Sequence, residues 1–146
     1  MGKASRAIII ENNKILVMRR NKQGSQYFTL VGGKLNDHET PEQALVRELK
    51  EETGLDVIAA RLVFFEEHPE PYNEQYIYLC NIAPRDNVEI QSTSEEALLN
   101  RLQTNLHEPL WVDLQSFTKL PFRTPQLQEA IVQCFKNGFP EKAVRL

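Results

Sequence analysis

The stretch GKLNDHETPEQALVRELKEETGL, from Gly33 to Leu55, is the most informative part of this chain. Its second half contains three glutamates, Glu48, Glu51 and Glu52, at offsets of zero, three and four. At about 3.6 residues per turn of an α-helix, these side chains lie on one face. Like charges at such offsets destabilise an isolated helix, and a divalent cation would reverse that effect. The pattern therefore predicts a helix whose acidic face binds a hard cation such as Mg²⁺.

The same stretch carries signals for both ends of the helix. Thr40 is a favoured N-cap residue, Pro41 suits the first helical position, and Gln43 is placed to complete a capping box. Gly54 suits the left-handed position that ends a helix. We therefore expect the helix to begin at Pro41 and to stop at Gly54. Its apolar stripe is expected to comprise Leu45, Val46 and Leu49.

The spacing of these residues resembles the signature of the Nudix (MutT-like) hydrolase family. That signature is a glycine, five residues, a glutamate, seven residues, and then Arg-Glu-aliphatic-x-Glu-Glu-x-Gly-aliphatic. A solvated helix rich in Glu and Lys would explain the charges but not the fixed spacing with two glycines. The fixed positions are filled by Gly33, Glu39, Arg47, Glu48, Leu49, Glu51, Glu52, Gly54 and Leu55.

The resemblance implies an α/β fold, the α/β/α sandwich of Nudix hydrolases, with a mixed β-sheet between helices. A length of 146 residues fits one domain, 1–146, and we expect a core over 3–138 and a frayed tail over 139–146. Trp111 is expected in the core. The expected elements are a hairpin of 5–10 and 15–18, strands at 27–33, 57–68, 76–82 and 110–113, a possible strand at 88–91, and helices at 94–102 and 126–136.

The resemblance also implies roles for the signature residues. Glu51 and Glu52 are the expected principal ligands of Mg²⁺, for which Mn²⁺ could substitute, and Glu48 is a further ligand or the general base. In relatives the carbonyl of the glycine before the signature often binds a metal, and here that glycine is Gly32. Arg47 is expected to orient the carboxylates rather than to touch substrate. Glu39 is expected to tether the preceding loop to the helix or to contact the metal through water.

Substrate contacts are expected outside the signature. In the family the strand equivalent to 15–18 often ends in a basic pair near the substrate, which here is Arg19 and Arg20. Tyr72 and Phe122 could stack on a base. Pro71, 16 residues beyond Leu55, resembles ADP-ribose hydrolases, whereas Tyr72, 17 residues beyond it, resembles dinucleoside polyphosphate hydrolases. Both alternatives therefore stay open.

Two further regions bear on the substrate and on the metal. Enzymes that clear oxidised guanine nucleotides often place an amide side chain just before the last helix, where this chain has Phe122-Arg123-Thr124. That difference disfavours an oxidised guanine nucleotide as the substrate. Relatives also carry an extra acidic residue in a variable loop. Here the candidates are Glu95, Glu96 and Glu108.

Composition restricts the remaining possibilities. A formal net charge of −3 provides no basic footprint for a nucleic-acid polymer. No apolar run approaches the roughly 20 residues of a membrane-spanning helix, and no signal peptide is evident. Cys80 and Cys134 show no metal-ligand or redox spacing, so we expect buried free thiols and a cytoplasmic protein. We expect no membrane partner and either a monomer or a homodimer.

Two functions are consistent with these features. The first is a Mg²⁺-dependent hydrolase that uses water to cleave the phosphoanhydride bond of a nucleoside diphosphate linked to another moiety. ADP-ribose and dinucleoside polyphosphates are specific forms of that substrate. The second is a non-catalytic nucleotide-binding module that keeps the fold. All the acidic positions of the signature are present, which favours the enzyme.

Overall fold

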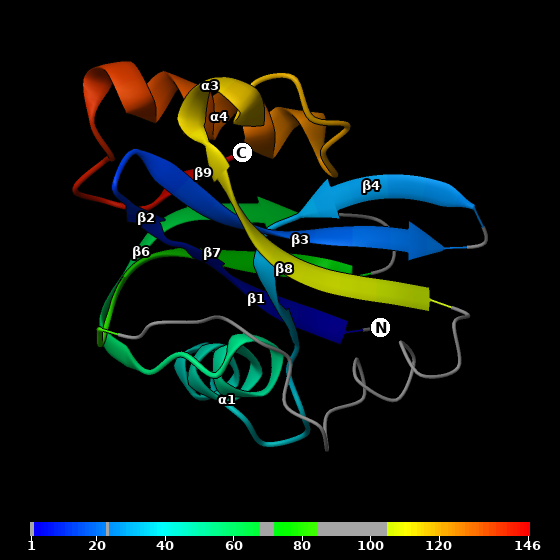
Figure 1. Cartoon of the computed structure of the whole chain (residues 1–146). Coiled ribbons are helices and arrows are strands. Elements are labelled where there is room, and N and C mark those ends of the chain that lie inside the picture. Colours follow the sequence, from blue (N-terminus) through cyan, green and yellow to red (C-terminus); the bar gives the residue numbers. More distant parts are fainter. Residues whose placement is uncertain (1, 23, 68–71, 85–104) are drawn as a thin grey trace.

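Helices cover both sides of the β-strands in a computed structural model of the chain (Figure 1). Helix α1 (Pro41–Thr53) lies on one side, and α3 (Leu114–Phe117) and α4 (Pro125–Asn137) lie on the other. The structure describes residues 2–22, 24–67, 72–84 and 105–146, with the backbone alone at 72, 73, 105 and 106. The expected α/β/α sandwich with a mixed sheet is confirmed. The strands, however, form two sheets rather than one.

The first sheet is mixed and has the strand order β5-β1-β7-β6-β9. Strands β1 and β7 run parallel, as do β6 and β9, and the other neighbours run antiparallel. The second sheet is antiparallel, with β3 between β4 and β8, and β2 also paired to β3. The mixed sheet comprises β1 (Gly2–Ile8), β5 (Val31–Lys34), β6 (Val57–Glu67), β7 (Tyr72–Ile82) and β9 (Val144–Arg145). The antiparallel sheet comprises β2 (Ile10–Glu11), β3 (Lys14–Lys22), β4 (Ser25–Thr29) and β8 (Asn105–Asp113).

The chain passes from one sheet to the other at Ile9 and again at Leu30. The predicted hairpin is right only where β2 meets β3, because residues 5–8 belong to β1 and pair with β5 and β7. The strand expected over 27–33 likewise divides into β4 and β5, which lie in different sheets. The second crossing brings the glycines of β5 beside α1.

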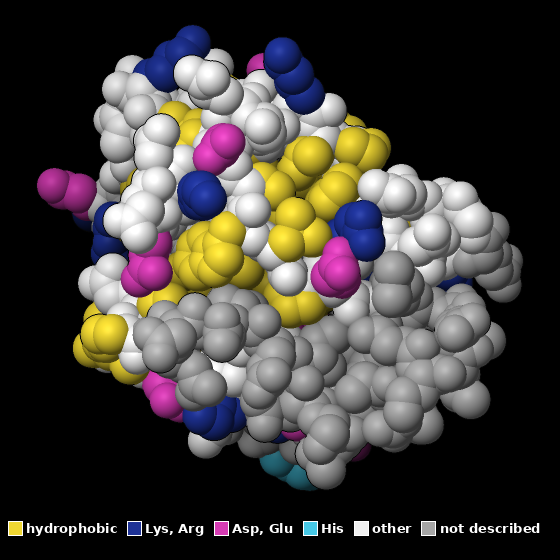
Figure 2. All heavy atoms as spheres, viewed as in Figure 1, with side chains coloured by type: hydrophobic (Ala, Val, Ile, Leu, Met, Phe, Trp, Pro, Cys, Tyr) yellow, Lys and Arg dark blue, Asp and Glu magenta, His cyan; other side chains and the backbone are white. Residues whose placement is uncertain are grey.

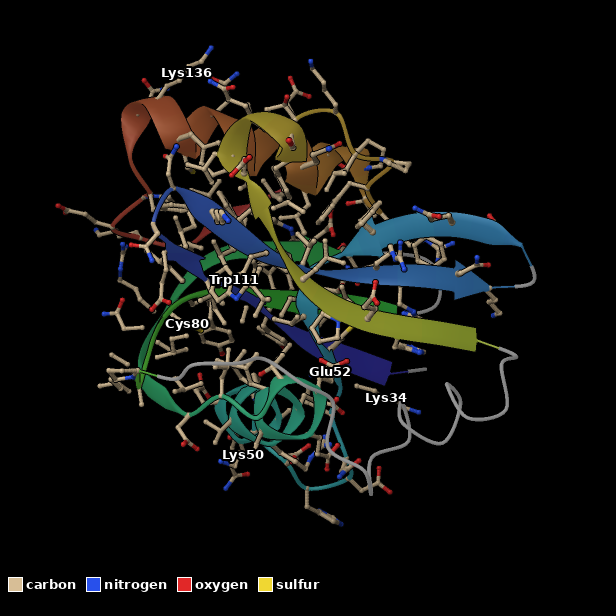
Figure 3. All side chains as sticks on the ribbon, in the orientation of Figure 1. Lys34, Lys50, Glu52, Cys80, Trp111 and Lys136 are labelled. Atoms are coloured by element: carbon tan, nitrogen blue, oxygen red, sulfur yellow. The ribbon has the colours of Figure 1, made fainter. Side chains whose placement is uncertain are left out.

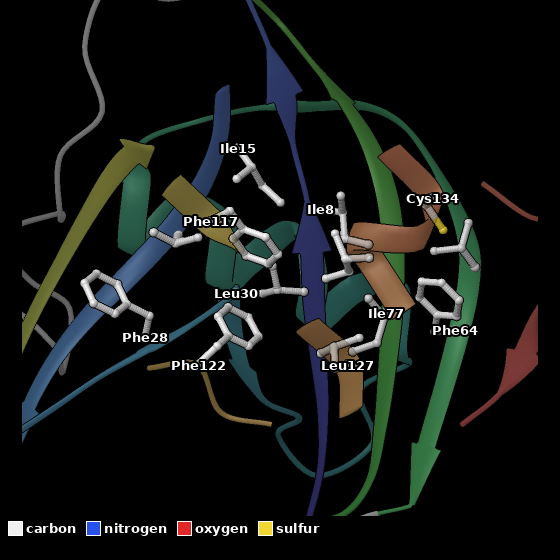
Figure 4. Close-up of a cluster of buried hydrophobic side chains, with 13 residues drawn as sticks. Ile8, Ile15, Phe28, Leu30, Phe64, Ile77, Phe117, Phe122, Leu127 and Cys134 are labelled. Atoms are coloured by element: carbon white, nitrogen blue, oxygen red, sulfur yellow. The ribbon is translucent and has the colours of Figure 1, made fainter. Parts of the chain in front are cut away.

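Two buried clusters hold the layers together. One, beneath α3 and α4, centres on Ile8, Ile77 and Phe117 (Figure 4). The other, beneath α1, includes Leu45, Leu49 and residues of both sheets. Each buried aliphatic or aromatic side chain contributes about 1.5–3 kcal/mol relative to exposure. These clusters therefore fix α1 and α4 on opposite faces of the strands.

Helix α1 begins and ends as its sequence predicts. Thr40 caps the helix in a complete capping box with Gln43, Pro41 occupies the first turn, and Gly54 ends it with φ 76°. The predicted apolar stripe is partly wrong. Leu45 and Leu49 are fully buried, but Val46 is 50% exposed.

Several predicted boundaries are corrected. Strand β3 extends to Lys22, beyond the predicted end at residue 18, so Arg19 and Arg20 lie within the strand. Strand β8 begins at Asn105, before the predicted 110–113, and Trp111 is only partly buried against the cluster beneath α1. The expectation of a frayed tail over 139–146 is wrong at its end. Residues 144–145 form β9 along β6, and the amide of Leu146 donates to the Phe65 carbonyl at 2.8 Å.

Other predictions are confirmed, and two concern residues that the structure does not describe. Strands β6 and β7 form the expected antiparallel pair, and α4 begins after Thr124. Cys80 and Cys134 are buried free thiols, and burial raises the pKa of Cys80 to about 12. The predicted strand at 88–91 and helix at 94–102, with Glu95 and Glu96, lie outside the described residues.

Gly32 is the position where the fold depends most directly on glycine. Its φ is +136°, and a Cβ there would lie 2.0 Å from the carbonyl oxygen of Ser5. We expect Gly32→Ala to lower the free energy of unfolding by at least about 3 kcal/mol, because it adds a backbone clash to conformational strain. Urea denaturation measures this change.

Gly24 provides the matched control for that substitution. It also has a positive φ, +85°, but no described atom lies within 4 Å of the position that a Cβ would take there. Gly24→Ala should therefore cost only about 1 kcal/mol. Equal stability of the two variants would contradict the proposed close approach of β5 and β1.

Candidate active site

The acidic face of α1 lies against the turn that carries the two glycines of β5. Glu52 is 3% exposed, and its Oε1 accepts a 2.6 Å hydrogen bond from the backbone amide of Gly32. Figure 3 shows the Glu52 side chain on the side of α1 that faces the strands. This bond sets the position of the second half of the helix relative to β5.

Glu48 lies one turn before Glu52 and packs on the next glycine. Only 7% of Glu48 is exposed, and a Cβ on Gly33 would lie 2.6 Å from its carboxyl carbon. A side chain at position 33 would therefore displace the carboxylate. The two glycines of β5 have different physical roles: Gly32 has a special backbone conformation, and Gly33 leaves room for Glu48.

Arg47 binds the carboxylates on either side of it. Its guanidinium donates to Glu39 twice, from Nε to Oε2 at 2.8 Å and from Nη2 to Oε1 at 2.9 Å. Nη1 donates to Glu48 Oε1 at 2.9 Å and to Glu51 Oε2 at 3.4 Å. Nη2 also donates to the carbonyl of Lys34 at 3.0 Å. Arg47 thus orients carboxylates and ties the loop before α1 to the helix.

Glu39 completes that connection from the loop. Its Oε1 also accepts from the backbone amide of Asn36 at 2.8 Å. The hydrogen bond from Arg47 holds the pKa of Glu39 below its ordinary value, and the neighbouring carboxylates raise the pKa of Arg47. Both groups are therefore charged at neutral pH.

The carbonyl of Gly32, the expected backbone ligand, faces a cation of the protein itself. Nη1 of Arg6 donates to this oxygen at 3.0 Å, and Arg6 is 9% exposed. Because a carbonyl oxygen has two lone pairs, it can accept this bond and still have one acceptor direction left. Arg6 therefore links the acidic site to the region beyond β1.

The donor groups of this site suit a hard divalent cation. Three carboxylates and one carbonyl provide oxygen ligands only, the type preferred by Mg²⁺ and Mn²⁺. Over the described residues, no three histidine, cysteine, aspartate or glutamate side chains already lie together as a metal cluster. Glu48 and Glu51 contact Arg47, whereas Glu52 contacts Gly32. A cation would have to draw the carboxylates together.

The predicted substrate residues are not all brought to one place. Arg20 lines a cavity beside β4, whereas Arg19 forms a 2.7 Å ion pair with Glu108 across β3 and β8. Phe122 is 5% exposed and packs edge-on against Phe117 in the core (Figure 4). The backbone of Tyr72 begins β7, but its side chain is outside the described part of the structure.

The described residues on the face seen in Figure 2 form no separate charged cluster. Their basic and acidic side chains are intermingled, and neither kind gathers into a patch. Apolar side chains gather instead over β8 and toward α3 and α4. Leu110, Val112 and Leu114 are partly buried residues of these elements.

Sequence reasoning missed the groups that surround the cavity with Arg20. They include Arg6 of β1, Gln75 of β7 and Arg123, which precedes α4. Glu66 lies behind them at 2% exposure and accepts from Gln75 Nε2 at 3.1 Å. No local motif joins these residues. The sequence pointed to one of them only, because Arg123 lies just before the last helix, a region where a substrate contact was expected.

Comparison with known proteins identifies the class to which this fold and site belong. The NUDIX domain model matches residues 1–133. The chain therefore belongs to the Nudix family, whose enzymes generally use divalent metal ions.

The sequence similarity to two relatives within the family covers only part of the chain. The 8-oxo-dGTP diphosphatase of Proteus vulgaris is 39% identical over 70 residues, which are 47% of this chain and 62% of that protein. The ADP-ribose pyrophosphatase of Methanocaldococcus jannaschii is 51% identical over 49 residues, 33% of this chain and 29% of that protein. The matches thus span less than two thirds of either relative's length.

Solved structures support the fold over a larger share of the chain. A NUDIX hydrolase from Nitrosomonas europaea superimposes with a TM-score of 0.69 at 16% identity, covering 94% of this chain and 90% of the other. At this identity the likeness concerns the fold. In the described part of the chain, no helix has the length and apolar character to cross a membrane.

The ion pair between Glu39 and Arg47 should make stability depend on pH. Because the folded-state pKa of Glu39 lies below 4.5, its contribution is present above that value and is lost as the pH falls through the lowered pKa. We expect Glu39→Gln to lower the free energy of unfolding by about 1 kcal/mol at pH 7 and by much less at pH 3. Urea denaturation with EDTA at both pH values measures this difference.

Glu141→Gln is the control, because Glu141 is an exposed carboxylate of the C-terminal segment. It should have the same small effect at both pH values. A cost of Glu39→Gln that does not change with pH would contradict a stabilising role for the charged carboxylate.

Proposed function

We propose that this protein is a Mg²⁺-dependent hydrolase of phosphoanhydride bonds, acting on a nucleoside diphosphate linked to another moiety. The observation that carries the proposal is the arrangement of Glu48 and Glu52. Both carboxylates are more than nine-tenths buried beside the glycines of β5, next to the half-buried Glu51. Buried carboxylates on one helical face are costly unless a positive charge compensates them. Arg47 provides one such charge, and a divalent cation provides more.

We assign each residue of the site a separate role in the reaction. Glu51 and Glu52 would hold Mg²⁺ as its principal ligands, and Glu48 would be a further ligand or accept the proton of the attacking water. The ion would supply positive charge for the phosphoryl oxygens and would lower the pKa of a water that it binds. Arg47 and Glu39 keep these carboxylates in position through the bonds described above. The carbonyl oxygen of Gly32, which accepts from Arg6, would be a further oxygen ligand.

The proposal also concerns which groups the diphosphate of the substrate carries. Curated relatives include an ADP-ribose pyrophosphatase and an 8-oxo-dGTP diphosphatase, which differ in the group beyond the phosphates. We propose a small nucleotide as substrate, ADP-ribose or a dinucleoside polyphosphate being specific forms, with Mn²⁺ able to replace Mg²⁺. We further propose one domain over 1–146, in the cytoplasm, as a monomer or homodimer.

One observation favours a second function, a nucleotide-binding module without catalysis. The three carboxylates of α1 contact protein groups and do not converge as a metal cluster in the described residues. If they cannot converge on a cation, the protein would bind a nucleotide without hydrolysing it. The two functions differ in whether the protein hydrolyses the nucleotide that it binds.

A phosphate-release assay separates the two functions. We expect at least one compound in a panel of nucleoside diphosphate derivatives to be hydrolysed with Mg²⁺, detected after coupling to a phosphatase, and EDTA to abolish the reaction. Glu52→Gln should lower kcat/KM at least about a hundredfold, because it removes a charged ligand.

Glu129→Gln makes the same chemical change at an exposed position of α4, away from the acidic face of α1. Its rates should equal those of the wild type. No turnover of any compound by the wild-type protein would contradict the hydrolase and favour the binding module.

A further inference from the structure

A cationic cavity lies between the strands and the beginning of α4. It has a volume of about 210 Å³, and four basic side chains line it: Arg6, Arg20, Lys22 and Arg123. No carboxylate is among its lining residues within the described part of the chain. Sites for neutral ligands are lined mainly by apolar and aromatic groups with few charges. Four basic groups around one cavity repel one another, and an anion would reverse that repulsion.

Two of the basic residues have no carboxylate partner among the described residues. Among the described residues, neither Lys22 nor Arg123 forms an ion pair with a carboxylate. The guanidinium carbon of Arg123 lies 4.3 Å from the ring centroid of Tyr27, and that of Arg20 lies 5.5 Å from the same centroid. A shared aromatic ring thus helps to hold two guanidinium groups at the cavity.

The N-terminus of α4 adds to the positive character of this cavity. Thr124 has the conformation of an N-cap residue, but its side chain makes no capping hydrogen bond. Its Oγ1 donates instead to Glu66 Oε2 at 2.7 Å. The first turn of this 13-residue helix therefore lacks its side-chain acceptor, and Thr124 and Leu127 line the cavity. Helix N-termini of this kind favour anions.

A buried hydroxyl group provides independent evidence for a ligand. Thr29 is 6% exposed and lines the cavity, and its Oγ1 has no hydrogen-bond partner among the described residues. Leaving such a group unsatisfied costs about 1–3 kcal/mol. A bound acceptor oxygen would satisfy it.

The wall of the cavity is fixed by hydrogen bonds. Gln75 accepts from Arg6 Nε at 3.1 Å and donates to Glu66 at 3.1 Å, so its amide has one defined orientation. Glu66 places one negative charge behind this wall, at 2% exposure. The basic side chains that line the cavity therefore outnumber the one carboxylate behind its wall.

Two hydrogen bonds connect the lining of the cavity to the acidic face of α1. Arg6 lines the cavity and donates to the Gly32 carbonyl at 3.0 Å, and the Gly32 amide donates to Glu52 at 2.6 Å. A group attached to a diphosphate at Glu52 would therefore pass Arg6 and Gly32 to reach the cavity.

We propose that the cavity binds a second anionic group of the substrate, a phosphate, so that one of the two groups joined by the diphosphate carries a phosphate of its own. This inference rests on the proposed hydrolase function. Arginine and lysine bind phosphate oxygens through charge-assisted hydrogen bonds, and helix N-termini add backbone donors. Arginine can also bind the neutral O6 and N7 edge of guanine. The point charge of Lys22 and the uncapped helix favour the anion.

Binding of inorganic phosphate in EDTA tests the cavity without metal or turnover. By isothermal titration calorimetry, we expect wild-type protein to bind phosphate, and Lys22→Gln and Arg123→Gln each to weaken binding about tenfold. Both residues are exposed, so these variants should fold. Lys136→Gln removes a charge from the other end of α4 and should bind as the wild type does (Figure 3). Absent binding, or equal binding by all four proteins, would overturn the proposal.

Hydrolysis of matched compounds tests the substrate class. Coenzyme A and dephospho-coenzyme A differ by one phosphate, as do NADPH and NADH. With Mg²⁺ we expect kcat/KM to be at least about tenfold higher for the phosphate-bearing member of a pair, and Arg123→Gln to abolish that preference. Lys136→Gln should retain it.

The possible outcomes separate this inference from the proposed function. Hydrolysis without preference in either pair would overturn the second phosphate but leave the hydrolase standing. A preference for guanine nucleotides that does not depend on an added phosphate would assign the cavity to a base and also overturn it. Phosphate binding without turnover of any diphosphate would overturn the hydrolase and, with it, the substrate class.

Discussion

The hydrogen bond between the Gly32 amide and Glu52 is the constraint on which the site depends. At 2.6 Å it joins the β5 turn to the last turns of α1. It requires β5 to approach β1 so closely that a Cβ at position 32 would lie 2.0 Å from the Ser5 carbonyl oxygen. The crossing of the chain between sheets at Leu30 makes this approach possible. The fold therefore places the backbone amide of Gly32 against a buried carboxylate, while the carbonyl of the same residue accepts from Arg6.

Electrostatic balance around Arg47 follows from that geometry. One guanidinium contacts Glu39, Glu48 and Glu51, while Glu52 lies nearby on the same helical face. The carboxylates outnumber the cation that holds them. A divalent cation held by these carboxylates would relieve this crowding and would offer positive charge to a phosphate. On the other side of Gly32, Arg6 begins a region of opposite charge, so the proposed substrate lies between an acidic helix and a basic cavity.

Much of the helix and its chemistry could be predicted from sequence, because the signals are local. Thr40, Gln43 and Gly54 act within one turn of the ends of α1, and the signature spacing identifies the acidic face. The crossings at Ile9 and Leu30 could not be predicted, since an apolar run such as 7–10 fits one strand as well as two. The cavity depends on β1, β3, β4, β7 and α4 meeting in space. Strand β9 was missed because its two residues pair with β6 from far along the chain.

The acidic face of α1 is proposed as a divalent-cation site, and the effect of Mg²⁺ on the unfolding temperature tests this proposal most directly. A ligand that binds only the folded state raises this temperature. We expect an increase of several degrees for the wild type and for Glu129→Gln, about 3–5 °C if Mg²⁺ adds roughly 1 kcal/mol of stability. The increase should be much smaller for Glu51→Gln and Glu52→Gln. An equal increase in all four proteins would show that Mg²⁺ binds elsewhere and would contradict the account.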